Sequence, residues 1–123
     1  MDYRATVCEL IAGMLADAHR AGMDRHEVAA VASRLTGKDV TKNMLDSYTA
    51  PAREDFNCPL WLAPVLEVVC KATSLASWHA GIHGGRLTVG AETIDAEIGR
   101  LMSERDSTDA RLKELKDLRR RVR

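Results

Sequence analysis

The last quarter of the chain is one long amphipathic segment that limits what the protein can fold into. From Ala91 onward there is no proline, and the only glycine is Gly99. Seam positions recur in alternating steps of four and three residues, at Ile94, Ile98, Leu101, Arg105, Thr108, Leu112, Leu115, Arg119 and Val122. This is heptad spacing with a polar middle, and it predicts a long helix of the coiled-coil type over residues 91–123.

A helix of this length needs a partner for its apolar side. About thirty helical residues span roughly 50 Å, so part of the helix must project from a domain built by the rest of the chain. An isolated amphipathic helix is also marginal in water, because helix nucleation is costly. The seam is then covered by another protomer or by the protein's own domain, and we favour another protomer because glycines precede the helix. The predicted oligomerisation residues are Ile94, Ile98, Leu101, Leu112 and Leu115.

The remainder of the chain predicts a compact helical domain. Apolar residues fall at helical spacing in five segments, at about 2–20, 24–36, 41–48, 59–70 and 74–82. Glycines cluster after the fifth segment, which marks a boundary. The predicted fold is therefore all-α, with a five-helix domain over residues 1–85, a linker over 86–90 and the long charged helix over 91–123.

Capping residues and prolines suggest where these helices begin and end. Asp24, followed by Glu27, is a capping-box pattern, and Thr41 is suited to cap the third helix. Pro64 is expected to bend the fourth helix or to delay its start. The side chains expected to point inward are Val7, Leu10, Ile11, Met14, Leu15, Ala18, Val28, Val31, Ala32, Leu35, Met44, Leu45, Tyr48, Leu62, Val65, Leu66, Val69, Cys70, Leu75, Trp78 and Ile82.

Composition narrows the class of protein. The net charge is zero, with 18 basic and 18 acidic residues, whereas DNA-binding proteins usually carry a basic surplus. The C-terminal end, RLKELKDLRRRVR, is locally basic; its arginines suit the negative end of a helix dipole or DNA phosphates. We see no secretory signal and no apolar stretch long enough to span a membrane, and three irregularly spaced cysteines fit free thiols. A cytoplasmic protein without membrane contact is expected.

The segment from His26 to Pro51 carries the most functional information. It combines a helix, a glycine-bearing turn and a short second helix. Small residues such as Ala29 and Ala32 allow the two helices to cross closely, and the apolar Val40 fills the angle between them. This pattern is what a helix-turn-helix over about 25–49 requires.

This segment resembles the helix-turn-helix regulators of the phage repressor and Cro type. The phrase LTGKDVTKNMLDSYTA also resembles small regulatory proteins of Mu-like phages and prophages. The resemblance implies a DNA-binding transcription regulator that binds double-stranded DNA as a dimer. It departs from the family in its longer turn and in Asp46, an acid that phosphate would repel. The nucleic-acid-binding face implied for the third helix consists of Thr41, Lys42, Asn43, Asp46 and Ser47.

Other interpretations remain open at this point. The two helices could form a hairpin that only packs, or the domain could dock another protein while the long helix oligomerises. A positive surface around Lys42 and Asn43 would favour DNA, and an apolar surface there would favour a protein partner. Trp61 is expected in the core, with partial exposure at a partner surface as the alternative.

We predict no catalytic site, no cofactor and no metal site. His79 and His83 are four residues apart, but Cys58 and Cys70 lack the close pairing of zinc ligands. Glu54 and Asp55 are adjacent in a loop, which is typical of a solvated turn. The chain has no nucleophile elbow, Walker loop, zincin motif or dinucleotide fingerprint.

Overall fold

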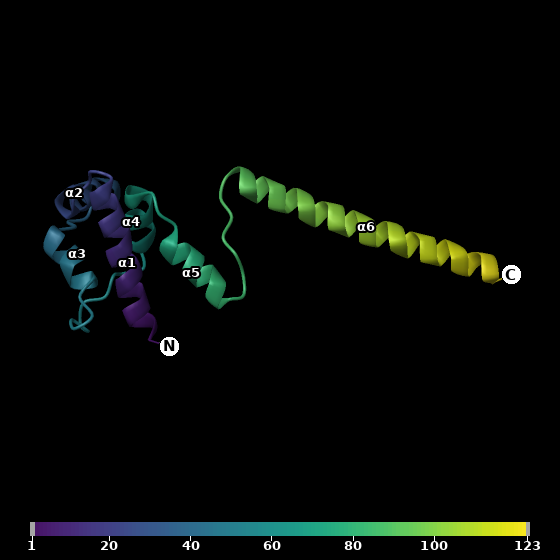
Figure 1. The fold of residues 1–123 in the computed structure, drawn as a ribbon, viewed down its shortest axis with the longest axis horizontal. Coiled ribbons are helices and arrows are strands. Elements are labelled where there is room, and N and C mark those ends of the chain that lie inside the picture. Colours follow the sequence, from purple (N-terminus) through teal and green to yellow (C-terminus); the bar gives the residue numbers. More distant parts are fainter. Residues whose placement is uncertain (1, 123) are drawn as a thin grey trace. The chain divides into compact units, whose positions relative to one another are not determined.

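A computed structural model of the protein describes residues 2–122; Met1 and Arg123, which begin and end the predicted segments, lie outside the described residues. Within that range the chain forms six α-helices and no strand (Figure 1), namely α1 (Tyr3–Arg20), α2 (Arg25–Thr36), α3 (Lys42–Tyr48), α4 (Ala63–Cys70), α5 (Ser74–Ile82) and α6 (Ala91–Arg121). The all-α class and the long C-terminal helix are thereby confirmed. Contacts divide the chain into two units, one ending at Arg86 and the other beginning at Leu87.

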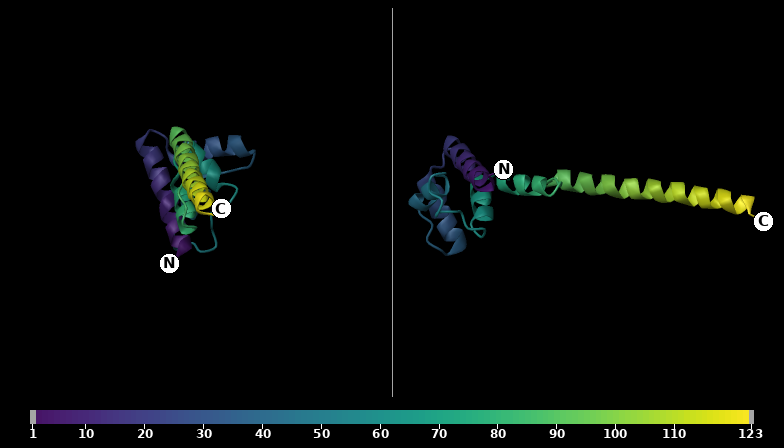
Figure 2. Two further views of the ribbon diagram at one scale, coloured as in Figure 1. Left: turned by 90° about the vertical axis from the view of Figure 1, so that its right-hand side faces the viewer. Right: turned by 90° about the horizontal axis from the view of Figure 1, so that it is seen from below.

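The first unit packs α1–α5 around a single apolar core. In this unit α2 lies against α3 and α4, and α1 lies against α2, α4 and α5 (Figures 1 and 2). The largest fully buried side chains are Ile11, Met14, Leu15, Val28, Leu45, Leu62 and Leu66. All of them come from the helical stripes seen in the sequence or immediately precede a helix, so the helical phase predicted for α1 and α3 is correct.

Side-chain caps position the first three helices. The carboxylates of Asp2 and Asp24 and the hydroxyl of Thr41 each accept a hydrogen bond from a backbone N–H in the first turn, at 2.9–3.2 Å. Gly37 ends α2 in the left-handed conformation, with φ of 68°, which glycine adopts without steric cost. The caps predicted at Asp24 and Thr41 are confirmed, and together they fix the start of α2 and of α3.

The fourth helix begins later than the sequence predicted. It starts at Ala63 rather than near Pro59, and Pro64 lies in its first turn. Proline lacks an N–H group, which is not needed at the start of a helix, so Pro64 is compatible with the helix only near that end. The preceding residues form a turn in which the N–H of Leu62 donates to the carbonyl of Pro59 at 3.0 Å.

Two residues of the predicted helical stripes are exposed. Leu35 is 60% exposed and Ile82 is 42% exposed. Each lies in the last turn of its helix, on the same stripe as buried residues one or two turns earlier. The helical phase was therefore correct, but the extent of the core was overestimated.

The second unit contains α6, which runs for 31 residues without interruption (Figure 2). None of its residues is buried. The seam residues Ile98, Leu101 and Leu115 are each about half exposed, at 50%, 51% and 47%. The predicted helix is therefore present, and its apolar side is open to solvent.

We predict that Leu45→Ala destabilises the protein by about 2–5 kcal/mol, because the side chain is fully buried and its removal leaves a cavity. Leu35→Ala is the matched control: it removes the same atoms from an exposed site and should cost within about 0.5 kcal/mol. Urea denaturation of both variants measures the two costs. Equal costs would contradict the assigned burial.

Candidate nucleic-acid interface

The turn between α2 and α3 is held by one apolar and one polar interaction. Val40 is 4% exposed and belongs to the core. The hydroxyl of Ser33 accepts a hydrogen bond from the N–H of Val40 at 2.9 Å and lies 2.9 Å from the carbonyl oxygens of Val40 and Ala29. Burying Val40 would otherwise leave its backbone groups short of partners, so Ser33 makes the burial possible. Val40 was predicted to have this role; Ser33 was not.

A charged network connects the start of α2 to α3. One carboxylate oxygen of Asp46 lies 2.8 Å from the guanidinium of Arg25, and the other lies 2.8 Å from the ammonium of Lys42. Arg25 also donates to the hydroxyl of Thr49 at 3.1 Å. The hydrogen bond from Lys42, followed by that from Arg25, lowers the pKa of Asp46 despite some desolvation. Asp46 is therefore a carboxylate at neutral pH whose charge is matched by two cations.

The residues predicted for DNA binding divide into two groups. Asn43 is exposed, and the side chains of Lys42 and Asp46 are 41% and 38% exposed, so these three lie on the outer face of α3. Thr41 is also exposed, but its oxygen caps the helix. Ser47 does not belong to this face, and its assignment as an exposed contact was wrong.

Ser47 is 7% exposed and fully engaged inside the protein. Its hydroxyl donates to the carbonyl of Asn43 at 3.0 Å and accepts from the guanidinium of Arg53 at 3.1 Å. Arg53 comes from the loop after α3, and no periodic pattern in the sequence predicts this contact. The loop is itself held by Arg4, which donates to the carbonyl of Pro51 and to the side chain of Asn57, each at 2.8 Å.

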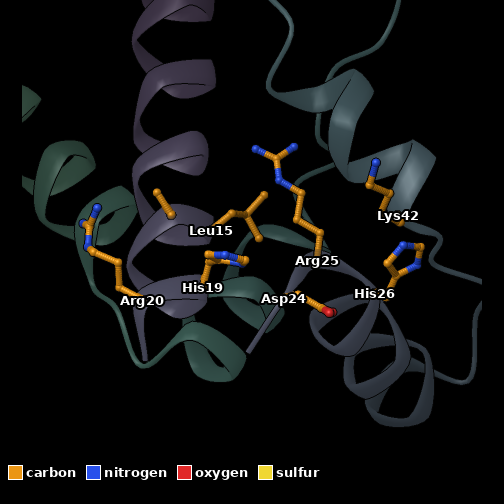
Figure 3. Close-up of a pocket in the computed structure, with 8 residues that line it drawn as sticks. Leu15, His19, Arg20, Asp24, Arg25, His26 and Lys42 are labelled. Atoms are coloured by element: carbon orange, nitrogen blue, oxygen red, sulfur yellow. The ribbon is translucent and has the colours of Figure 1, made fainter. Parts of the chain in front are cut away.

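A surface pocket of about 460 Å³ lies beside this network, where α1 ends and where α2 and α3 begin (Figure 3). Five of the residues that line it carry basic side chains: His19, Arg20, Arg25, His26 and Lys42. Asp24, the cap of α2, is its only acidic lining residue. Arg20 points away from the other labelled side chains in Figure 3 and pairs with Asp17. The pocket thus brings Arg25 and Lys42, which can bind phosphate, to one surface.

The turn is attached to the rest of the unit by a cation–π contact that the sequence did not reveal. The ammonium of Lys38 lies 5.3 Å from the ring centre of Trp61. Trp61 is 44% exposed, so the expectation that it lies in the core was wrong, and the partial exposure given as the alternative is observed. Lys38 belongs to the turn and Trp61 to the segment before α4, so the contact joins regions more than twenty residues apart.

On the surface around Lys42, part of the positive charge is matched by Asp46. Elsewhere, all three cysteines are free, and burial raises the pKa of Cys70 and raises that of Cys58 to about 11. In residues 2–122 no group of three or more potential ligands could hold a metal ion. Across the same residues no helix has the length and apolar character to cross a bilayer.

No family model, curated protein or solved structure matches the chain.

The Asp46 network predicts a specific pH dependence. Because the folded pKa of Asp46 is lower than the unfolded one, the network stabilises the fold above the unfolded pKa, and this contribution is lost as the pH falls through the folded pKa. The side chains are roughly a third exposed, so we expect less than about 1 kcal/mol. Lys42→Met should raise the pKa of Asp46 in an NMR titration, whereas Lys38→Met should leave it unchanged. An unchanged pKa in Lys42→Met would contradict the network.

Proposed function

We propose that α2, the turn and α3 act as a helix-turn-helix that binds double-stranded DNA, in a non-enzymatic transcription regulator of phage or prophage type. The observation that carries the proposal is the buried turn: Val40 in the core and Ser33 on its backbone fix α3 against α2. This leaves Lys42 and Asn43 on an outer face of α3, next to the basic pocket. Resemblance of the sequence to repressor-type regulators supports the same function.

The exposed groups have the chemistry that DNA recognition needs. Asparagine can pair with an adenine edge and lysine with a guanine edge or a phosphate. Arg25 and His26, at the start of α2, are suited to contact the backbone, which positions such a unit on the duplex. Asp46 is less unfavourable than its sequence position suggested, because its charge is matched within the protein. Lys42 and Arg25 would exchange this carboxylate for phosphate oxygens on binding.

Charge balance explains why a dimer is part of the proposal. Residues 1–86 contain nine basic and ten acidic residues, so one unit alone should have little general attraction for DNA. Two linked units make twice the contacts, and the second binds at a high effective concentration. The exposed seam of α6 is the surface through which we propose that the copies associate.

A second function, docking of another protein, is favoured by one observation. An apolar pocket of about 550 Å³ lies among α1, α4 and α5, and no residue of α2 or α3 lines it. Its lining includes Leu60, which is 85% exposed, and Trp78. Exposed apolar surface of this kind often marks a contact with a partner. If the folded parent protein bound none of the DNA fragments in the test below, docking of another protein would be the favoured function.

We expect Lys42→Ala and Asn43→Ala each to weaken binding to a selected site by about 1–3 kcal/mol if the two side chains contact base edges. The site is first isolated from fragments of the source genome, and fluorescence anisotropy then gives the dissociation constants. Lys71→Asn is the matched control, because it removes an exposed lysine in a left-handed position that asparagine tolerates. A double variant that binds as tightly as the parent would rule out α3 as the recognition helix.

A further inference from the structure

Charge is strongly segregated along α6. Residues 91–110 contain six acidic and two basic side chains, whereas residues 111–122 contain six basic and two acidic side chains. Both halves belong to one uninterrupted helix with no buried residue. An apolar seam runs through both, with Ile98 and Leu101 in the acidic half and Leu112 and Leu115 in the basic half. The helix thus carries two apolar patches of opposite surrounding charge.

We infer that α6 pairs with α6 of a second copy in antiparallel orientation. This inference rests on the proposed function only in taking the exposed seam as the surface of association. Opposite orientation places the acidic half of one helix beside the basic half of the other. Parallel orientation places like beside like along the whole length. Charge therefore selects the orientation, and the apolar seam supplies the attraction.

One register pairs the apolar residues in the middle of the seam, and it sets Ile94 opposite Arg119 of the second copy at each end. If Leu101 lies opposite Leu112 of the second copy, Ile98 lies opposite Leu115. The two-fold axis of the pair repeats both of these contacts in the other half. Arg105 then lies opposite Thr108 of the second copy, in the middle of the pair. Arg105 and Thr108, the polar residues in the middle of the heptad pattern, face one another at the centre, and no apolar residue is opposed to these two. This central layer favours the register, because a shift of one heptad in either direction would set Arg105 against Leu101 or Leu115.

The flanking residues match in the same register. Glu104 lies across from Arg111 of the second copy, and Asp95 lies across from Lys116; each ion pair occurs twice by symmetry. In the single helix, Glu104 pairs with Arg100, and Arg111 lies 3.6 Å from Glu114. These intrahelical pairs are exposed and screened, so they do not prevent the exchange.

The parallel alternative is unfavourable at the same positions. It would place Glu104 near Asp109 of the second copy and Arg111 near Lys116, which are like-charged pairs. It would also oppose Arg105 to Arg105 and Arg119 to Arg119 within the seam. Like charges at these sites destabilise a coiled coil. In the antiparallel pair the N-termini of the two helices lie about 45 Å apart, so the two first units attach at opposite ends.

A charge reversal distinguishes the orientations, because its effect has opposite signs. Sedimentation equilibrium of the full-length protein at low ionic strength gives the dissociation constant of self-association. We expect Glu104→Arg to raise it by about tenfold, as two attractive pairs become repulsive. The double variant Glu104→Arg/Arg111→Glu should restore the parent value. Asp106→Arg is the control: it makes the same charge change at an outer position of the helix and should have a much smaller effect.

Several results would overturn the inference. Tighter association of Glu104→Arg would show a parallel pair, because arginine would then face Asp109. A monomeric parent protein, an effect equal to that of Asp106→Arg, or no recovery in the double variant would each contradict antiparallel pairing. Sedimentation is measured without DNA, so its failure is separate from a failure of Lys42 and Asn43 to affect DNA binding.

Discussion

The burial of Val40 in the turn between α2 and α3 is the interaction on which the arrangement of the first unit depends. A buried residue in a turn brings its peptide N–H and carbonyl groups away from water, and each needs a partner. Ser33, one turn before the end of α2, supplies that partner from within the helix. The side chain of Val40 then joins the core that α2 and α3 share with Leu45. Because the same residue anchors the turn and fills the core, α3 has a defined position on α2.

On the outer face of α2 and α3, the carboxylate of Asp46 offsets part of the charge of the basic side chains. Asp46 holds Arg25 and Lys42, both of which come from helix starts, in one network. This network has two consequences. It ties α2 to α3 at the surface, and it keeps two cations next to the pocket in the absence of a ligand. In our account, phosphate competes with Asp46 for the same cations, so binding to DNA carries an internal cost that limits nonspecific affinity.

Local patterns in the sequence predicted much of this fold. The caps at Asp24 and Thr41 and the buried stripes of α1 and α3 follow from interactions within a few residues. Long-range contacts were not predictable in this way. The buried hydroxyl of Ser47 has a partner in Arg53 from a later loop, and Leu35 is exposed although it shares a stripe with buried residues. The sequence left open whether Pro64 bends α4 or delays its start, and the structure shows the delayed start.

The candidate site shows the same division. Periodicity placed Lys42, Asn43 and Asp46 on one face, and the structure agrees. It gave no sign that Arg25 shares a carboxylate with Lys42, because the two lie on different helices. The basic pocket was also not foreseen, since its side chains come from three helices that are separate in sequence. Along α6, by contrast, both the seam and the charge segregation are visible in the sequence, because they are properties of one helix.

In the proposed function, the cations held by Asp46 bind DNA phosphate. The most direct test is the salt dependence of DNA binding by Asp46→Asn, which keeps the shape and acceptor oxygen of the side chain but removes its charge. Freed of this competitor, Lys42 and Arg25 should bind phosphate more strongly. We predict tighter binding and a slope of log K against log salt that is steeper by about 1–2. Glu54→Gln, which makes the same charge change in the exposed loop after α3, should alter neither quantity appreciably. Equal behaviour of the two variants would contradict the claim.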